Sequence, residues 1–155
     1  KEETENSWRI KGKVIYPPVA VDKIKPLKKE KIILSVGRFS EYLKDKKHKL
    51  MIDAFQRLTK EYSLDGWSLH LAGAAGEGDK PYLDELKEYC KGINIFLHPN
   101  ISFDELKNLY GKSLIYWHAA GYGEKDPTKM EHFGITTVEA MAGGCVPIVI
   151  NLGGQ

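Results

Sequence analysis

Two glutamates eight residues apart, Glu131 and Glu139, flank a small-residue turn that opens a predicted helix. The first turn of a helix presents unpaired backbone N–H groups and the positive end of the helix dipole, which suits a phosphate. Carboxylates on either side of such a site accept hydrogen bonds from hydroxyl groups. Eight helical residues rise about 12 Å, so the two carboxylates can serve two different hydroxyl-bearing groups. The segment 131–144 therefore predicts a site for phosphate between two sets of hydroxyls, as in a sugar nucleotide.

The spacing of the two glutamates is by itself a weak signal. The chain has 13 glutamates, so about one such pair arises by chance, and Glu77 with Glu85 is another. The surroundings of the first pair make the difference. Thr136 and Thr137 offer hydroxyl donors, and Glu139 lies in an otherwise apolar stretch, where a carboxylate should have a partner.

A second set of candidate residues follows the first predicted strand. Gly37 and Arg38 stand at the end of that strand, and Lys46 lies just before the next helix. A guanidinium and an ammonium group at this place would neutralise a diphosphate. The glycine fingerprint of dinucleotide sites is missing here, and the P-loop pattern occurs nowhere in the chain. Taken alone, these residues also fit two ordinary surface cations.

The composition fits one globular domain with a substantial core. The chain has 155 residues, 42% of them hydrophobic and 28% charged, with a formal net charge of +2. This balance argues against nucleic-acid binding by bulk electrostatics, and the lysine clusters at 23–31 and 44–49 fit solvated faces. No apolar run approaches the ~20 residues that span a bilayer, and no signal peptide is visible. We therefore expect a cytoplasmic protein.

The cysteines and histidines indicate no metal centre. Cys90 and Cys145 are far apart in the sequence, and we expect both to be reduced thiols. The five histidines have neither HxxxH nor HExxH spacing, so a structural metal is not expected.

Apolar runs and helical periodicity alternate from residue 31 onward, which predicts an α/β fold. The strands are nearly continuous apolar runs, as in a doubly wound parallel sheet covered on both faces. Ligands of such sheets bind beyond the carboxyl ends of the strands. We expect strands at 31–36, 67–73, 93–97, 113–117 and 146–150, and helices at 48–62, 81–91, 102–111 and 136–143.

The chain divides into two parts on composition. Residues 1–30 have the proline and charge content of a linker, with a short strand at 13–16 stopped by Pro17 and Pro18. Residues 31–155 form the domain proper. The site-bearing loops are expected at 37–47, 73–80, 98–102, 118–134 and 151–155.

At these residues the chain resembles the donor-binding half of a GT-B fold retaining glycosyltransferase, from the large group that includes glycosyltransferase family 4. The segment 131–144 resembles the E-x7-E motif of the family and is the most specific of the matches. The segment 35–38, with Lys46 and the stretch 50–55, resembles the first strand, the phosphate-binding cations and the first helix. The segment 14–19 resembles the crossing from the acceptor domain. The match covers nearly the whole chain and implies a Rossmann-like nucleotide-sugar domain.

The resemblance also implies roles for the candidate residues. Arg38 and Lys46 would hold the donor diphosphate beside Gly37, with Lys47 as the alternative to Lys46. Glu131 would accept hydrogen bonds from hydroxyl groups of the donor sugar.

The remaining implied roles concern the nucleotide. Glu139 would bind the ribose hydroxyls, Thr136 and Thr137 would cap the diphosphate, and His98 would lie against the base. Backbone N–H groups would contact the sugar and phosphates at Phe133, Gly134 and Ile135. No metal ion or other cofactor is expected, since the cations and the helix N-terminus can neutralise the diphosphate.

The chain departs from the family pattern at two places. The loop 118–130 is longer than the usual link; we favour a peripheral surface insertion over a lid above the donor. The chain also stops at Gln155 and lacks an N-terminal acceptor domain, so we expect an excised domain that is incomplete at its C-terminus.

The expected function is transfer of a hexose from a nucleotide-diphosphate sugar to a hydroxyl acceptor held by the N-terminal domain of the parent chain. The fragment alone should bind donor weakly and turn over little. A lipid-linked acceptor and a peripheral position at the inner face of a membrane are compatible with the basic clusters. Two alternatives remain open: a GT-B-like sugar-nucleotide epimerase or phosphorylase, and a non-catalytic receiver-like α/β module.

Overall fold

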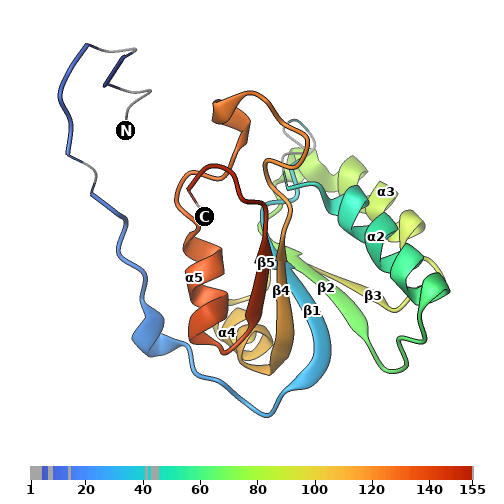
Figure 1. Cartoon of the computed structure of the whole chain (residues 1–155). Helices are drawn as coiled ribbons and strands as arrows, with labels where there is room; N and C mark the ends of the chain where they lie inside the picture. The colour runs from blue at the N-terminus through green and yellow to red at the C-terminus, as the bar shows by residue number, and fades with distance from the viewer. Residues whose placement is uncertain (1–4, 7–8, 14, 41, 43–45, 155) are drawn as a thin grey trace.

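A five-stranded parallel sheet forms the centre of the part of the chain that the structure describes (Figure 1). The structure is a computed structural model, and it describes residues 5–6, 9–13, 15–40, 42 and 46–154. The strand order is β3-β2-β1-β4-β5, and every neighbouring pair is parallel. The strands are β1 (Glu30–Val36), β2 (Ser68–Gly73), β3 (Ile95–Pro99), β4 (Ser113–His118) and β5 (Val146–Val149).

Helices cover both faces of the sheet, so the predicted doubly wound α/β fold is confirmed. Figure 1 shows α2 and α3 on one side of the strands and α4 and α5 on the other. Two separate apolar cores lie beneath these two layers. The helices are α2 (His48–Glu61), α3 (Lys80–Tyr89), α4 (Phe103–Lys112) and α5 (Ile135–Ala142), with short 3-10 turns at η1 (Val21–Lys23), η2 (Glu77–Asp79) and η3 (Pro127–Lys129).

Local chemistry explains where several elements begin and end. Ser102 and Glu105 form a capping box at the start of α4: the Ser102 hydroxyl accepts from the Glu105 N–H at 3.3 Å, and Glu105 accepts from the Ser102 N–H at 2.8 Å. Strand β3 starts two residues later than predicted. The reason is that Ile93 still belongs to the turn leaving α3, where its N–H donates to the carbonyl of Cys90.

The predicted short strand at 13–16 is wrong for the residues that can be compared. Lys13, Ile15 and Tyr16 lie in no strand, and Val14 lies outside the described residues. The two prolines that follow remove backbone donors, and no neighbouring strand pairs with this segment.

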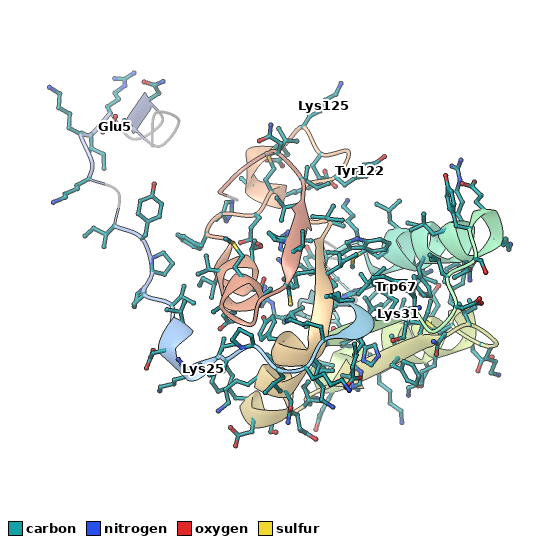
Figure 2. All side chains as sticks on the ribbon, turned by 60° about the horizontal axis from the view of Figure 1, so that its bottom comes forward. Glu5, Lys25, Lys31, Trp67, Tyr122 and Lys125 are labelled. Carbon is teal, nitrogen blue, oxygen red and sulfur yellow. The ribbon has the colours of Figure 1, made fainter. Side chains whose placement is uncertain are left out.

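Residues 24–29 pack against the domain, whereas the segment before them extends away from it. Ile24 is only 2% exposed within the core under α4 and α5, and the Leu27 N–H donates to the carbonyl of Gly111. The Lys29 ammonium donates to the carbonyls of Ser113 and Gly143, which ties the start of β4 to the end of α5. Figure 2 shows Glu5 far from the sheet, at the end of the extended segment.

The strand order creates a crevice between β1 and β4. From β1 the chain turns to β2 on one side, and from β4 it turns to β5 on the other. The connecting loops therefore separate at the carboxyl ends of these two strands, which is where open α/β sheets bind ligands.

Candidate functional site

The loops that follow β1 and β2 are in direct backbone contact at this crevice. A Cβ atom added to Gly73 would lie 2.0 Å from the carbonyl oxygen of Gly37, so no larger residue fits there without displacing backbone. The Gly37 N–H donates to the carbonyl of Ala72, and the Phe39 N–H donates to that of Ala74. Arg38, between these two bonds, is thereby fixed at the mouth of the crevice.

A first pocket of about 480 Å³ opens at the ends of the first three strands, and we call it the strand-end pocket. It combines backbone from three loops with the first turn of α5. Its lining residues are Val36, Gly37, Arg38, Gly73, Ala74, Asn100, Ile101, Leu106 and Thr136.

A second pocket of about 550 Å³ lies beside the first, and we call it the loop pocket. Arg38 lines both pockets and so marks their junction. The loop pocket carries charged groups of both signs. Its lining residues are Arg38, Tyr42, Lys46, Glu124, Thr128, Lys129, Met130, Glu131, His132 and Phe133.

Glu131 is the most heavily bonded carboxylate of the site. One oxygen, Oε1, accepts from the backbone N–H groups of His132, Phe133 and Gly134 at 3.1, 3.2 and 3.3 Å. The other, Oε2, lies 3.2 Å from the ammonium nitrogen of Lys46 and 3.0 Å from Nε2 of the buried His118. A single side chain therefore organises the turn before α5 and joins it to β4 and to the loop after β1.

These contacts keep Glu131 ionised. The hydrogen bond with His118 lowers the pKa of Glu131 most, and the Phe133 N–H, the Lys46 charge and the Gly134 N–H lower it further. Partial burial opposes them but does not prevail. Glu131 is thus a fixed negative charge at the floor of the loop pocket.

The first turn of α5 adjoins the strand-end pocket through Thr136. Gly134 precedes the helix with φ of 64°, a conformation that favours glycine, and this N-cap residue has no side chain with which to cap the helix. Thr136 lines the strand-end pocket, and its Oγ1 accepts from the Tyr116 hydroxyl at 2.7 Å. One turn further, Oε2 of Glu139 accepts from the Tyr110 hydroxyl at 2.9 Å.

The structure brings most of the predicted site residues together. Arg38, Gly37 and Thr136 line the strand-end pocket, and Lys46, Glu131 and Phe133 join Arg38 at the loop pocket. Gly134 and Ile135 form the start of α5 between them, and Glu139 lies one turn along the same helix, on the face of Thr136.

Three predicted residues lie elsewhere. Thr137 is buried at 8% exposure and lines neither pocket. Nε2 of His98 lies 2.9 Å from Nδ1 of His70, so the imidazole faces a neighbouring strand, and Asn100 occupies the pocket wall instead. Lys47 forms an ion pair with Glu124.

The loop 118–130 forms part of the candidate site. Glu124 lies 2.5 Å from the ammonium nitrogen of Lys47, and Glu124, Thr128, Lys129 and Met130 line the loop pocket. The expectation of a peripheral insertion is therefore wrong for these residues. Only the outer part of the loop projects from the domain, as Tyr122 and Lys125 show in Figure 2.

Sequence reasoning missed three residues that hold the predicted ones. Tyr110, Tyr116 and His118 are buried and contact Glu139, Thr136 and Glu131, respectively. The first two lie in apolar patterns typical of core residues, so the sequence carried no signal for the direction of their hydroxyl groups. His118 directly follows a predicted strand and is the first residue of a predicted site-bearing loop, and that position was a usable signal.

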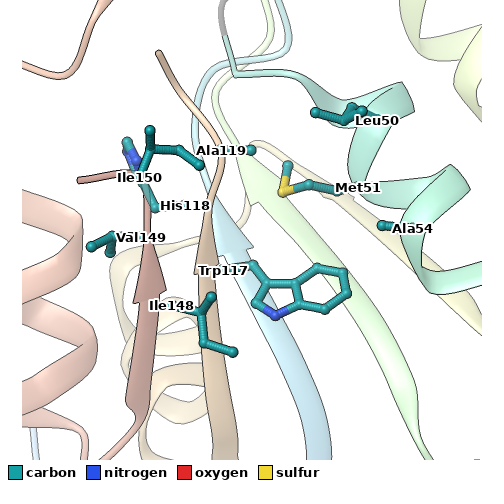
Figure 3. A pocket seen from close by; sticks show the side chains of 9 residues that line it. All are labelled: Leu50, Met51, Ala54, Trp117, His118, Ala119, Ile148, Val149 and Ile150. Atoms are coloured by element: carbon teal, nitrogen blue, oxygen red, sulfur yellow. The ribbon is translucent and has the colours of Figure 1, made fainter. Parts of the chain in front are cut away.

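A third hollow, of about 160 Å³, is of a different kind. It lies between α2 and the β4–β5 edge, where Figure 3 shows Trp117 and Ile148 on the strands and Met51 on the helix. Apolar side chains line almost all of it. It offers no set of charged groups and is not part of the candidate site.

The described residues contain neither a cluster of metal ligands nor a helix suited to a membrane. Among them, no group of three or more histidine, cysteine, aspartate or glutamate side chains is arranged to hold a metal ion. None of the helices in the described ranges is both long and apolar enough to cross a membrane.

Comparison with curated proteins finds relatives of one kind. The chain is 33% identical over 156 residues to "GDP-Man:Man(3)GlcNAc(2)-PP-Dol alpha-1,2-mannosyltransferase" of Mus musculus, covering 91% of this chain and 30% of that protein. It is 29% identical over 164 residues to the protein of the same name in Homo sapiens, covering 95% and 31%. The chain thus spans less than a third of the length of these relatives.

Solved structures show the same fold. The C-terminal domain of the glycosyl transferase group 1 family protein LpcC from Francisella tularensis matches with a TM-score of 0.64 and 21% identity, over 89% of this chain and 73% of that one. AviGT4, a glycosyltransferase involved in avilamycin A biosynthesis, matches with a TM-score of 0.64 and 20% identity, over 91% and 39%.

The family model described as "Glycosyl transferases group 1" matches residues 20–155, which include both pockets and every candidate residue named above. A receiver-like module is thereby ruled out. The chain belongs to the glycosyl transferases group 1 family.

Proposed function

We propose that the chain is the donor-binding domain of a glycosyltransferase that uses a nucleoside-diphosphate sugar. The observation that carries this proposal is the junction of the two pockets. There Arg38 lines both pockets, with Lys46 and the fixed charge of Glu131 at the loop pocket and Thr136, from the first turn of α5, at the strand-end pocket. Cations and the N-terminal end of a helix suit a diphosphate, and the two pockets provide room for a group on each side of it.

The proposed pose places the nucleoside in the strand-end pocket. The base would lie against the loop at Asn100 and Ile101, and Glu139 would accept hydrogen bonds from the ribose hydroxyls. The donor sugar would occupy the loop pocket, where the oxygens of Glu131 are acceptors for sugar hydroxyls. This orientation is the one that the family resemblance implies for the two glutamates.

The proposed chemistry is loss of a nucleoside diphosphate from the anomeric carbon. Negative charge grows on the leaving phosphate in the transition state, so groups that meet this charge more strongly there than in the bound donor accelerate the reaction. We assign this task to Arg38, Lys46 and the first turn of α5. Retention of anomeric configuration is proposed from the family, and the acceptor hydroxyl would come from an N-terminal domain of the parent chain.

The names of the relatives narrow the proposal. They specify GDP-mannose as donor and a dolichol-diphosphate-linked acceptor. We therefore propose GDP-mannose as the donor to test first and a lipid-linked glycan as the acceptor. Because dolichol is a membrane lipid, the parent enzyme would work at a membrane surface.

Calorimetric titration of the chain with GDP, UDP and GDP-mannose tests the proposal. We expect the chain to bind at least one of them. In Arg38→Ala the affinity should fall about tenfold or more, because one charge-assisted contact is lost. Arg57→Ala is the matched control, since Arg57 pairs with Glu61 on the exposed side of α2 and lines neither pocket. A correctly folded chain that binds none of the three ligands contradicts the proposal.

A further inference from the structure

Two buried tyrosines pack next to α5, and their hydroxyl groups donate hydrogen bonds to side chains of this helix. Tyr110 comes from α4 and Tyr116 from β4; both are fully buried, and their ring centroids lie 6.3 Å apart. Both belong to the apolar core under α4 and α5. A phenol buried in such a core needs a partner for its O–H group, and each of these phenols has one on the same face of α5.

The contact of Tyr110 gives Glu139 a defined orientation. The Tyr110 hydroxyl donates to Oε2 at 2.9 Å, and burial raises the pKa of Tyr110, so the phenol stays a donor. No described residue donates a hydrogen bond to Oε1. The carboxylate is therefore held by one oxygen and keeps the other for a ligand.

The contact of Tyr116 gives Thr136 a defined hydrogen-bond direction. The Tyr116 hydroxyl lies 2.7 Å from Oγ1 of Thr136 and 3.5 Å from the carbonyl oxygen of Val36, and the single proton goes to the nearer acceptor. A threonine hydroxyl that accepts from behind has its own proton left to donate. Thr136 lines the strand-end pocket, so this proton is available to an anion there.

We propose that Tyr110 and Tyr116 are positioning residues with separate tasks, the first serving the ribose through Glu139 and the second serving the diphosphate through Thr136. This inference rests on the proposed function. Neither tyrosine touches the ligand. Each fixes which part of its α5 partner is free: an acceptor oxygen for vicinal hydroxyls in one case, a donor proton for a phosphate oxygen in the other.

Phenylalanine variants combined with altered ligands separate these tasks. Tyr110→Phe and Tyr116→Phe each remove one oxygen and keep the ring in the core. Calorimetry would compare GDP, 2′,3′-dideoxy-GDP and GMP with the wild-type chain and both variants; UDP and its analogues replace them if the wild type prefers uridine. Circular dichroism melting reports whether each variant is folded.

We expect the two variants to respond to different changes in the ligand. Tyr110→Phe lowers the affinity for GDP about fivefold, which corresponds to about 1 kcal/mol of binding free energy. The affinity for the dideoxy analogue stays unchanged, because that ligand has no hydroxyl for Glu139. Tyr116→Phe lowers the affinities for GDP and dideoxy-GDP by the same factor. It lowers the affinity for GMP less, because the contact of Thr136 that Tyr116 supports is made to the diphosphate.

An equal loss of affinity for all ligands in both variants would overturn the inference, since it would indicate that the two tyrosine hydroxyls have a purely structural role. Unchanged GDP affinity in both variants would overturn it as well. Failure of the wild-type chain to bind any of these nucleotides is a different result, which overturns the proposed function together with the inference.

Discussion

The two glutamates that frame α5 are alike in the sequence and very different in their surroundings. Glu131 receives hydrogen bonds from three backbone N–H groups and lies within ion-pair distance of Lys46 and His118. Glu139 receives one hydrogen bond, from Tyr110. The first carboxylate is built into the structure of its turn, whereas the second is anchored on one oxygen only.

The difference indicates which carboxylate the fold depends on and which one it keeps for a ligand. Groups that hold a turn together contribute to stability whether or not a ligand is present. A carboxylate that is held by one oxygen only contributes little to stability until a ligand completes its hydrogen bonds. We therefore expect Glu131 to dominate stability and Glu139 to act mainly on binding.

The largest expected effect is the loss of stability in Glu131→Ala. This change leaves the N–H groups of the turn without an acceptor and Lys46 and His118 without their carboxylate, at a cost of about 3 kcal/mol in the free energy of unfolding. Urea denaturation measures it. Glu139→Ala is the matched comparison and should cost less than about 1 kcal/mol; equal losses would abolish the distinction between the two residues.

Acid sensitivity should be the next largest effect. Because the folded-state pKa of Glu131 is lowered, the unfolded chain binds more protons at acidic pH, and the stability from this group, present above the unfolded value, is lost as pH falls below about 4.5. Glu131→Gln should flatten this acidic part of a stability–pH curve, measured by denaturation at fixed ionic strength.

His70 provides an internal control in a separate pH window. Burial, and then the neighbouring His98, lower the pKa of His70 to about 4. The unfolded chain therefore binds more protons between pH 6.5 and 4, and stability decreases as the pH is lowered through this window, by at most about 3 kcal/mol. His70→Gln should remove that fall and leave the contribution of Glu131 below pH 4.5 intact. If His70→Gln and Glu131→Gln gave the same flat curve of stability against pH, the assignment of the two pH windows to these two residues would be wrong.

A smaller effect, confined to binding, is expected for Glu139→Gln. The amide keeps an acceptor oxygen but loses the charge, so GDP affinity should fall about tenfold, equal to about 1.4 kcal/mol, with the melting temperature nearly unchanged. Calorimetry and thermal melting give the two readouts. Glu88→Gln, which alters only an exposed pair with Lys91, is the control and should change neither.

The smallest effect concerns the wall of the loop pocket. Glu124→Gln breaks the ion pair with Lys47, and because exposed ion pairs contribute little, the free energy of unfolding should hardly change. Since this contact fixes the loop beside the proposed sugar position, affinity for GDP-mannose should fall by a larger factor than affinity for GDP. An equal change for both ligands would place the loop outside the sugar site.

The fold was accessible from the sequence because both faces of a parallel sheet are covered. Strands such as β1 and β2 are buried at successive residues and so have apolar residues on both faces, and the chain alternates them with helical periodicity. Boundaries set by individual turns were less accessible. The start of β3 depends on one hydrogen bond from Ile93 to Cys90, which periodicity does not encode.

The candidate site was accessible where function requires unusual residue types. A carboxylate among small and apolar residues, as at Glu139, and cations at a strand end, as at Arg38, stand out from a structural background. The residues that hold these side chains in place were not recognisable in the sequence. Tyr110 and Tyr116 satisfy a core pattern equally well whether their hydroxyl groups face α5 or solvent, and only the packing of α4 against α5 decides between the two.

The backbone leaving β5 lies against the turn held by Glu131. The Gly154 N–H donates to the carbonyl of Glu131 at 2.7 Å, and a Cβ atom on Gly154 would lie 1.9 Å from the carbonyl oxygen of His132. Such close contact means that a displacement of the turn must be transmitted to this strand exit. Leu152 is 45% exposed, so a fluorophore attached there offers an optical reporter of sugar occupancy that leaves the pocket walls unaltered.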